Sequence, residues 1–174
     1  MFYTPFRFIS LSTVAASLVS VHALAAQNLS SMMVEIRQQN GIPSYYNLAT
    51  GMPLNGDIAI VRDNQGYTLG QFSQGIPNGK WQVFHTNNSR IVEGNYQQGY
   101  QDGTWRLFDL DGTITEEQQF AKGVPVGEWK EFSPNGHVNQ STVYQNGQKS
   151  QVKRFFPSGK LQAQESYLDN LRHG

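Results

Sequence analysis

The sequence contains no cysteine and few charged side chains. Its 174 residues include 13 Lys and Arg against 13 Asp and Glu, and charged residues make up 15% of the chain, where about 25% is usual for a soluble domain. Without cysteine the chain cannot hold a disulfide framework, a thiol nucleophile, a Cys-ligated zinc ion or a lipid-anchored cysteine. Because the formal net charge is zero, the chain lacks the basic surface typical of nucleic-acid binding, and we expect no nucleic-acid partner.

Long apolar runs are also missing, apart from one near the N-terminus. An uncharged run from Phe8 to Val21 follows the one charged residue of this region. Ala23 and Ala25 are small residues at the positions that signal peptidase needs, so the sequence predicts a cleaved signal peptide over 1–25, with cleavage before Ala26. A membrane-spanning helix is the alternative, but a run of about 14 residues is shorter than the roughly 20 that span a bilayer.

The predicted signal peptide implies an exported protein. An exported chain of this size that lacks cysteine is unusual for a eukaryotic secretory pathway, where domains usually carry disulfides. The sequence therefore favours the periplasm of a Gram-negative cell as the location of the mature chain.

The strongest pattern in the chain is an internal repeat of 24 residues. Aromatic residues, glycines and tryptophans share this spacing, and no tryptophan lies outside it. The aromatic series is Phe72, Tyr96, Phe120 and Tyr144, with Tyr167 after 23 residues; the glycines are Gly75, Gly99, Gly123 and Gly147; the tryptophans are Trp81, Trp105 and Trp129. A period in this range is typical of architectures in which each copy packs on its neighbours.

Each copy is predicted to be a β-hairpin. Regularly spaced glycines mark turns, and the runs between them are rich in aromatic and β-branched residues. Asp111-Gly112 and Asn135-Gly136 are dipeptides that tight hairpins prefer. About six hairpins give an all-β fold, an elongated antiparallel β-hairpin array in a single twisted sheet. We expect the tryptophans to form one ladder along it and the Phe72 series to form a second.

The copies decay toward both ends, which divides the mature chain, 26–174, into three parts. Residues 26–56 hold a capping hairpin over Met32–Tyr46 and the stretch that leads into the array. Residues 57–167 hold the repeats, and 168–174 begin a copy that stops. Atypical terminal copies are expected of an array that must protect its two exposed sheet edges.

Three of the copies resemble the variant MORN repeat. They are Gly-Ile-Pro-Asn-Gly-Lys-Trp (75–81), Gly-Tyr-Gln-Asp-Gly-Thr-Trp (99–105) and Gly-Val-Pro-Val-Gly-Glu-Trp (123–129). The stretch from Asn40-Gly41 to Asn55-Gly56 resembles the start of YwqK-like proteins, a group labelled as antitoxins. The resemblance implies a MORN-type sheet that acts as a scaffold, a protein-binding module or a lipid contact, and an antitoxin is its more specific interpretation.

We expect no enzyme activity, no metal and no cofactor. The segment 109–112 is similar to part of a calcium loop, but Leu107 and Gln118 occupy the first and last ligand positions, where Asp and Glu are needed. His85 and His137 have no partner at metal-ligand spacing. The sequence also lacks a G-x-S-x-G elbow, a phosphate loop and an H-E-x-x-H motif.

One copy carries several acidic residues and is the candidate for partner recognition. An acidic patch would steer a basic partner toward it, whereas an ordinary solvated face explains the same residues without a partner. For the tryptophans the alternative is a structural role, because consensus positions usually define the repeat unit. The candidate partner-binding residues are Asp102, Arg106, Asp109, Asp111, Glu116, Glu117, Tyr100, Trp81, Trp105 and Trp129.

The leading hypothesis is a non-enzymatic, protein-binding protein of the periplasm. It would be an immunity protein, or antitoxin, that occludes a periplasm-acting toxin or secreted effector such as a phospholipase or a wall hydrolase. The alternative is an envelope scaffold or a lipid-associated structural protein. Membrane contact would use Lys149, Lys153 and Arg154, although a chain with no net charge is a poor ligand for an anionic membrane. The sequence leaves the oligomeric state open.

Overall fold

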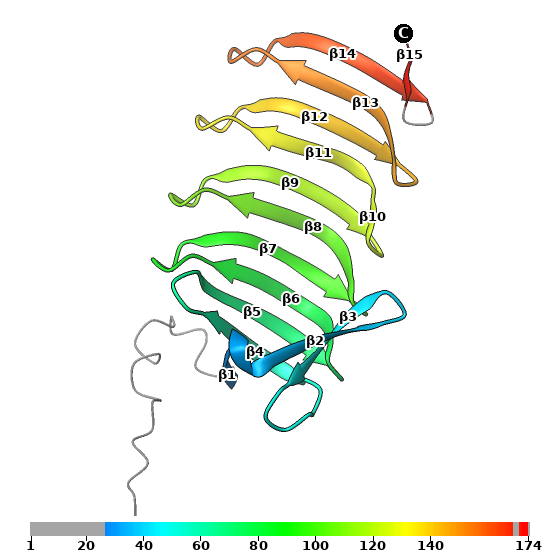
Figure 1. Cartoon of the computed structure of the whole chain (residues 1–174). Coiled ribbons are helices and arrows are strands. Elements are labelled where there is room, and N and C mark those ends of the chain that lie inside the picture. The colour runs from blue at the N-terminus through cyan, green and yellow to red at the C-terminus, as the bar shows by residue number, and fades with distance from the viewer. Residues whose placement is uncertain (1–26, 169–170, 174) are drawn as a thin grey trace, which may run out of the picture.

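The computed structural model describes residues 27–168 and 171–173, which form an all-β fold. The predicted signal peptide over 1–25 and its cleavage site lie outside the described residues, as do 169–170 and 174 of the predicted last copy. Figure 1 shows one long twisted sheet whose strands are stacked like rungs in chain order from β4 to β15. The predicted all-β hairpin array is confirmed.

The rungs of this sheet are hairpins that follow one another along the chain. Its strands are β1 (Gln27–Ser30), β4 (Gly56–Arg62), β5 (Gly66–Ser73), β6 (Ile76–Phe84), β7 (Arg90–Gln97), β8 (Tyr100–Phe108), β9 (Ile114–Ala121), β10 (Val124–Pro125), β11 (Gly127–Phe132), β12 (Val138–Gln145), β13 (Gln148–Phe155), β14 (Leu161–Leu168) and β15 (Leu171–His173). A further hairpin, β2 (Val34–Gln39) with β3 (Ile42–Asn47), forms a separate two-stranded sheet. It occupies the segment in which the sequence predicts a cap.

The N-terminal end of the sheet departs from a purely antiparallel array. β1 pairs with β4 in parallel, with Gln27 opposite Ile58 and Ser30 opposite Val61. Parallel strands need a crossover connection, and the 3-10 helix Ser31–Met33 together with the β2–β3 hairpin supplies it. The antiparallel prediction is wrong for this one strand, because the chain leaves the sheet and re-enters it from the same end.

Two kinds of turn set the 24-residue period, one kind along each of the two sides of the sheet at which the strands end (Figure 1). The turns that connect one hairpin to the next have positive φ at both central residues, for example 49° at Gln74 and 83° at Gly75. This is the type I′ conformation, which matches the twist of paired strands and favours glycine. At the other edge a left-handed residue closes each hairpin. Asn88, with φ of 67°, takes the place of Gly112 and Gly136, since asparagine tolerates this conformation better than most residues.

The connecting turns stack on one another along their edge of the sheet. Gly99 donates its backbone N–H to Pro77 O (2.8 Å) in the preceding copy, and Gly123 does the same to Gln101 O (2.8 Å). These bonds hold neighbouring copies together outside the strand ladders. We name this edge the connecting-turn column; it comprises the turns at Gly75, Gly99, Gly123 and Gly147.

The tryptophans and the aromatic residues of the Phe72 series lie on one face of the sheet and interleave there, whereas Tyr67 and Phe84 stack on each other on the opposite face. Ring centroids are 5.1 Å apart for Trp81 and Tyr96, 5.0 Å for Tyr96 and Trp105, and 4.6 Å for Trp129 and Tyr144. The expectation of two separate ladders is therefore wrong. The strand register sets each tryptophan beside a ring of the adjoining strand, so the two series form one aromatic ladder.

The indoles of Trp105 and Trp129 are each hydrogen-bonded to the strand beside them. Trp105 Nε1–H donates to Asn95 O at 3.1 Å, and Trp129 Nε1–H donates to Gln119 O at 2.9 Å. A Cβ built on Gly94 would lie 2.2 Å from the Trp105 ring, so only glycine leaves room for the indole. Trp105 is consequently 4% exposed, and its one polar atom is satisfied, as a buried indole requires.

Replacing Trp105 with alanine should lower the free energy of unfolding by about 3–5 kcal/mol, because a large buried ring and its hydrogen bond are lost together. Urea denaturation followed by circular dichroism measures this. Leu110→Ala is the control, since Leu110 is 53% exposed and exposed substitutions usually change stability by no more than about 0.5 kcal/mol. Equal losses in the two variants would contradict a ladder that carries the fold.

Burial raises the pKa of the Tyr45 and Tyr96 phenols, because the interior disfavours the phenolate. A raised pKa in the folded state means that the stabilisation is complete below about pH 10, where the unfolded phenols titrate, and is lost as the pH rises above it. Urea unfolding across this range should show a falling free energy. The free energy of unfolding of a Tyr45→Phe, Tyr96→Phe variant should fall less steeply with pH. An unchanged slope would refute the assignment of this pH dependence to the two phenols.

Candidate protein-binding surface

The strands present two faces, because successive residues of a strand point to opposite sides. The aromatic face carries the ladder, and the opposite side, here named the charged face, carries a row of ion pairs. On it Arg106 lies between two acids on adjoining strands: its Nε is 2.9 Å from Glu117 Oε2 and its NH1 is 3.6 Å from Glu93 Oε1. These side chains largely neutralise one another, so Arg106 and Glu117 leave little charge for a partner to read.

The five acidic residues of the candidate copy lie in separate places. Asp102 lies beside the connecting-turn column, and Asp109 and Asp111 lie at the opposite edge of the sheet. Glu116 and Glu117 are neighbours on β9 and therefore point to opposite faces, Glu116 to the aromatic face. The structure thus divides the acidic patch that the sequence suggested, because residues close in the chain are separated by a whole strand or by the sheet itself.

Asp102 has a structural partner. Its Oδ1 accepts the backbone N–H of Lys122 in the next connecting turn at 3.1 Å. The residue one period earlier, Asn78, accepts the N–H of Gln98 at 3.0 Å in the same way. Asparagine and aspartate therefore serve equally at this position, and the charge of Asp102 is not needed to close the turn.

Asp109 also acts within the fold. Its Oδ1 accepts the backbone N–H groups of Asp111 (3.0 Å) and Thr113 (2.9 Å), which orders the hairpin turn between β8 and β9. Asp111 itself is exposed at the tip of that turn. Of the two acids at this edge, Asp111 is the one whose carboxylate faces solvent.

The remaining candidates differ in how far they reach the surface. Trp105 is buried, whereas Trp81 and Trp129 are partly exposed. Tyr100 is 43% exposed and packs against the connecting-turn column, where a Cβ built on Gly123 would lie 3.1 Å from its ring. Val124 is equally exposed and was not predicted from the sequence. It occupies the same repeat position as Tyr100, directly after the turn glycine, and that spacing could have identified it.

The β2–β3 hairpin lies across the N-terminal part of the aromatic face and of the column (Figure 1). The Tyr45 ring packs on Phe72, with centroids 5.1 Å apart, and on Trp81, at 6.2 Å. The Tyr45 backbone N–H donates to Gly75 O at 2.8 Å. Ile42, near the hairpin tip, lies against Gly99. The chain therefore already shows how an extended segment binds to this repeat surface.

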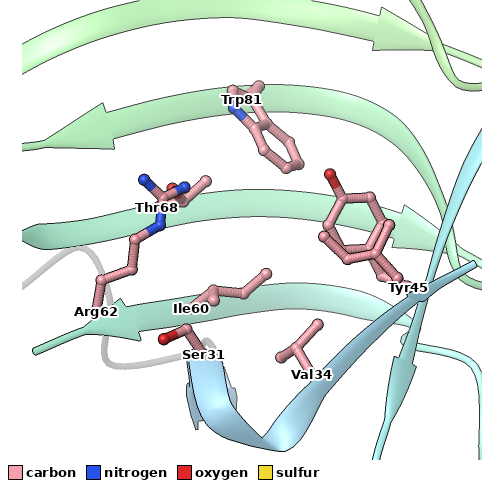
Figure 2. Close-up of a pocket in the computed structure, with 8 residues that line it drawn as sticks. Ser31, Val34, Tyr45, Ile60, Arg62, Thr68 and Trp81 are labelled. Carbon is pink, nitrogen blue, oxygen red and sulfur yellow. The ribbon is translucent and has the colours of Figure 1, made fainter.

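A small cavity of about 130 Å³ lies between the hairpin, the 3-10 helix and the sheet. Figure 2 shows that Trp81 and Tyr45 form its aromatic walls, with Ile60 and Val34 along the floor and Arg62 at one side. An Arg62 guanidinium N–H donates to Thr68 Oγ1 at 3.2 Å. Most of the lining is apolar, and the cavity is mainly an incompletely filled contact between the hairpin and the sheet.

The basic residues of β13 do not form one cluster. Arg154 pairs with Glu165 at 3.0 Å on the aromatic face, and Lys153 points to the charged face because it precedes Arg154 in the strand. Lys149 Nζ lies 5.3 Å from the Tyr167 ring centroid. A flat anionic membrane would therefore meet only part of this set at once.

Among the residues that the structure describes, no three His, Asp or Glu side chains come together in a group that could hold a metal ion. In the same part of the chain, no helix has the length and apolar character needed to span a bilayer.

Comparison with known families finds MORN-type repeats in the C-terminal half of the sheet. Residues 101–122, 125–146 and 150–169 match the MORN repeat variant, so three consecutive copies are repeats of this type. They correspond to the hairpins β8–β9, β11–β12 and β13–β14. MORN repeats indicate a repeat-type binding protein. No curated protein matches the chain at a significant level.

Solved structures give only weak likenesses. A mutant of S. aureus TarM in complex with Fondaparinux, alpha-GlcNAc-glycerol and UDP is 15% identical with a TM-score of 0.30, over 68% of this chain and 21% of that one. ASR alternansucrase in complex with isomaltononaose is 15% identical with a TM-score of 0.15, over 79% of this chain and 15% of that one. The chain thus spans about a fifth of the length of TarM and a smaller share of alternansucrase. Neither likeness carries a functional argument.

The structural role of Asp102 can be separated from its charge by two substitutions. Asp102→Asn keeps an acceptor for the Lys122 N–H, as at Asn78, so it should leave the free energy of unfolding unchanged. Asp102→Ala removes the acceptor and should cost about 1 kcal/mol. Thermal and urea unfolding measure both. If Asp102→Asn destabilised as much as Asp102→Ala, the carboxylate charge would matter to the fold.

Proposed function

We propose that this chain is a non-enzymatic, protein-binding repeat protein, and more specifically an immunity protein that occludes a toxin or secreted effector acting in the periplasm. The observation that carries the binding role is a continuous repeat surface on which the chain already holds one extended segment, β3, through Tyr45. The match to the MORN repeat variant supports it. The specific role rests on the resemblance to YwqK-like antitoxins and on the predicted signal peptide.

The sheet is large enough for this task. Strands lie about 4.8 Å apart and rise about 3.3 Å per residue, so the face measures roughly 50 Å by 25 Å. A stable complex buries about 800 Å² on each partner, which is less than this face offers. Inhibition would be steric: a rigid sheet placed over the active cleft excludes the substrate without any chemistry of its own.

Affinity capture tests the proposal. The tagged full-length chain, processed by its own host, is used to recover partners from envelope and secreted fractions, which are identified by mass spectrometry. We expect a stoichiometric hydrolase or other toxin, whose activity falls when the two are mixed, and cells that lose the chain should become sensitive to it. No bound toxin and unchanged sensitivity would refute the immunity role.

A matched pair of charge reversals on β11 locates the interface in the same experiment. Glu131 shares a face with Trp129, whereas Glu128 points to the charged face, and both are exposed. Binding through the aromatic face predicts that Glu131→Lys lowers capture and Glu128→Lys does not. The reverse result would assign the partner to the charged face.

The alternative function, a lipid-associated envelope scaffold, depends on Lys149, Lys153 and Arg154. Their division between the two faces of β13 argues against a shared membrane contact. Liposome flotation with anionic vesicles decides between the two functions. Salt-sensitive binding that a Lys149, Lys153, Arg154→Ala variant loses would favour the scaffold.

A further inference from the structure

The spacing of the connecting-turn column matches that of an extended chain. β3 runs along the column, with Ile42 at the Gly99 turn and Tyr45 at the Gly75 turn. Neighbouring turns are two strand spacings apart, about 9.6 Å, and three extended residues rise about 10 Å. An extended segment that contacts the column at every third residue can therefore reach one turn in each successive copy of the repeat.

The column continues beyond the hairpin with the same geometry. Gly75 O accepts the Tyr45 N–H. Within 27–168 and 171–173, no backbone hydrogen bond outside the strand ladders ends on Gly123 O. Tyr100 and Val124 lie on either side of Gly123 in the column, and each is 43% exposed. Gly123 O is therefore a backbone acceptor flanked by two exposed apolar side chains, whereas the equivalent acceptor at Gly75 is filled by β3.

We propose that the open part of the column, Tyr100, Gly123 and Val124, docks an extended segment of a protein partner that continues the line of β3. The segment donates a backbone N–H to Gly123 O, as Tyr45 does to Gly75 O. It carries an apolar side chain three residues before that donor, because the Ile42 side chain, three residues before Tyr45, lies against the neighbouring turn at Gly99. The inference rests on the proposed binding function and names the surface and the kind of segment that this function would use.

The first test uses the chain's own segment as a probe. A blocked synthetic peptide of residues 40–48 is titrated into the ¹⁵N-labelled full chain. The backbone amides of Tyr100, Gly123 and Val124 should shift, and a peptide with Ile42→Asp and Tyr45→Ala should leave them unchanged. Absence of shifts, or shifts confined to the Gly75 turn where the peptide replaces β3, would overturn the proposal.

Two matched variants make the result specific. Val124→Asp should weaken peptide binding by about tenfold or more, as substitutions at central contact residues do. Leu110→Asp places the same substitution on an exposed residue at the other edge of the sheet and should have no effect. Tyr100→Gln is a second variant of the site, and circular dichroism verifies that each variant folds. Equal binding by all three variants would overturn the proposal.

The same variants separate this inference from the proposed function. If affinity capture recovers a partner with the original chain and with Leu110→Asp, but not with Val124→Asp, both stand. If all of them recover the partner equally, the binding function stands and the docking surface is wrong. If the peptide binds at Gly123 but no protein partner is recovered, the site is real and the proposed function fails.

Discussion

Beyond the part that the β2–β3 hairpin covers, the described sheet is a single layer with no second sheet or helix on which to bury its apolar side chains, so its rings must bury one another. The aromatic ladder meets this constraint. Each tryptophan lies beside a ring of the adjoining strand, and Trp105 covers Gly94 closely enough that no side chain fits beneath it. Because these rings pack on rings of an adjoining strand, a single hairpin would be unstable and the array folds as a unit.

The same constraint explains the two edges of the sheet. Copies that must place their rings at constant spacing need turns of constant geometry, and the left-handed residues at both edges provide them. The turns are also bonded to one another, through glycine N–H groups and through Asn78 and Asp102. An edge built for regularity is therefore also a rigid, periodic surface, and β3 already uses it as one.

Much of the fold could be predicted from the sequence, because glycine, tryptophan and the 24-residue spacing each report a local requirement. The positive φ of the connecting turns and the hairpin ends depends only on neighbouring residues. The binding site was harder to predict from the sequence than the fold. Asp102 and Asp109 suggested a binding patch, but both carboxylates accept backbone N–H groups in turns. A valine after a turn glycine is not distinctive by itself, and only the repeat position that Val124 shares with Tyr100 points to it.

The sequence by itself determined the repeat, the hairpins and the residues that build the ladder, since these follow from short-range conformational preferences. Only the tertiary structure decided which residues share a surface. Strand register merged two aromatic series into one ladder, and alternation along β9 sent Glu116 and Glu117 to opposite faces. The position of the β2–β3 hairpin decided which copies are covered and which remain open. The physical reason is that the face on which a side chain lies, the strand register and the part of the sheet that the hairpin covers all depend on pairing between distant segments. No local sequence pattern encodes that pairing.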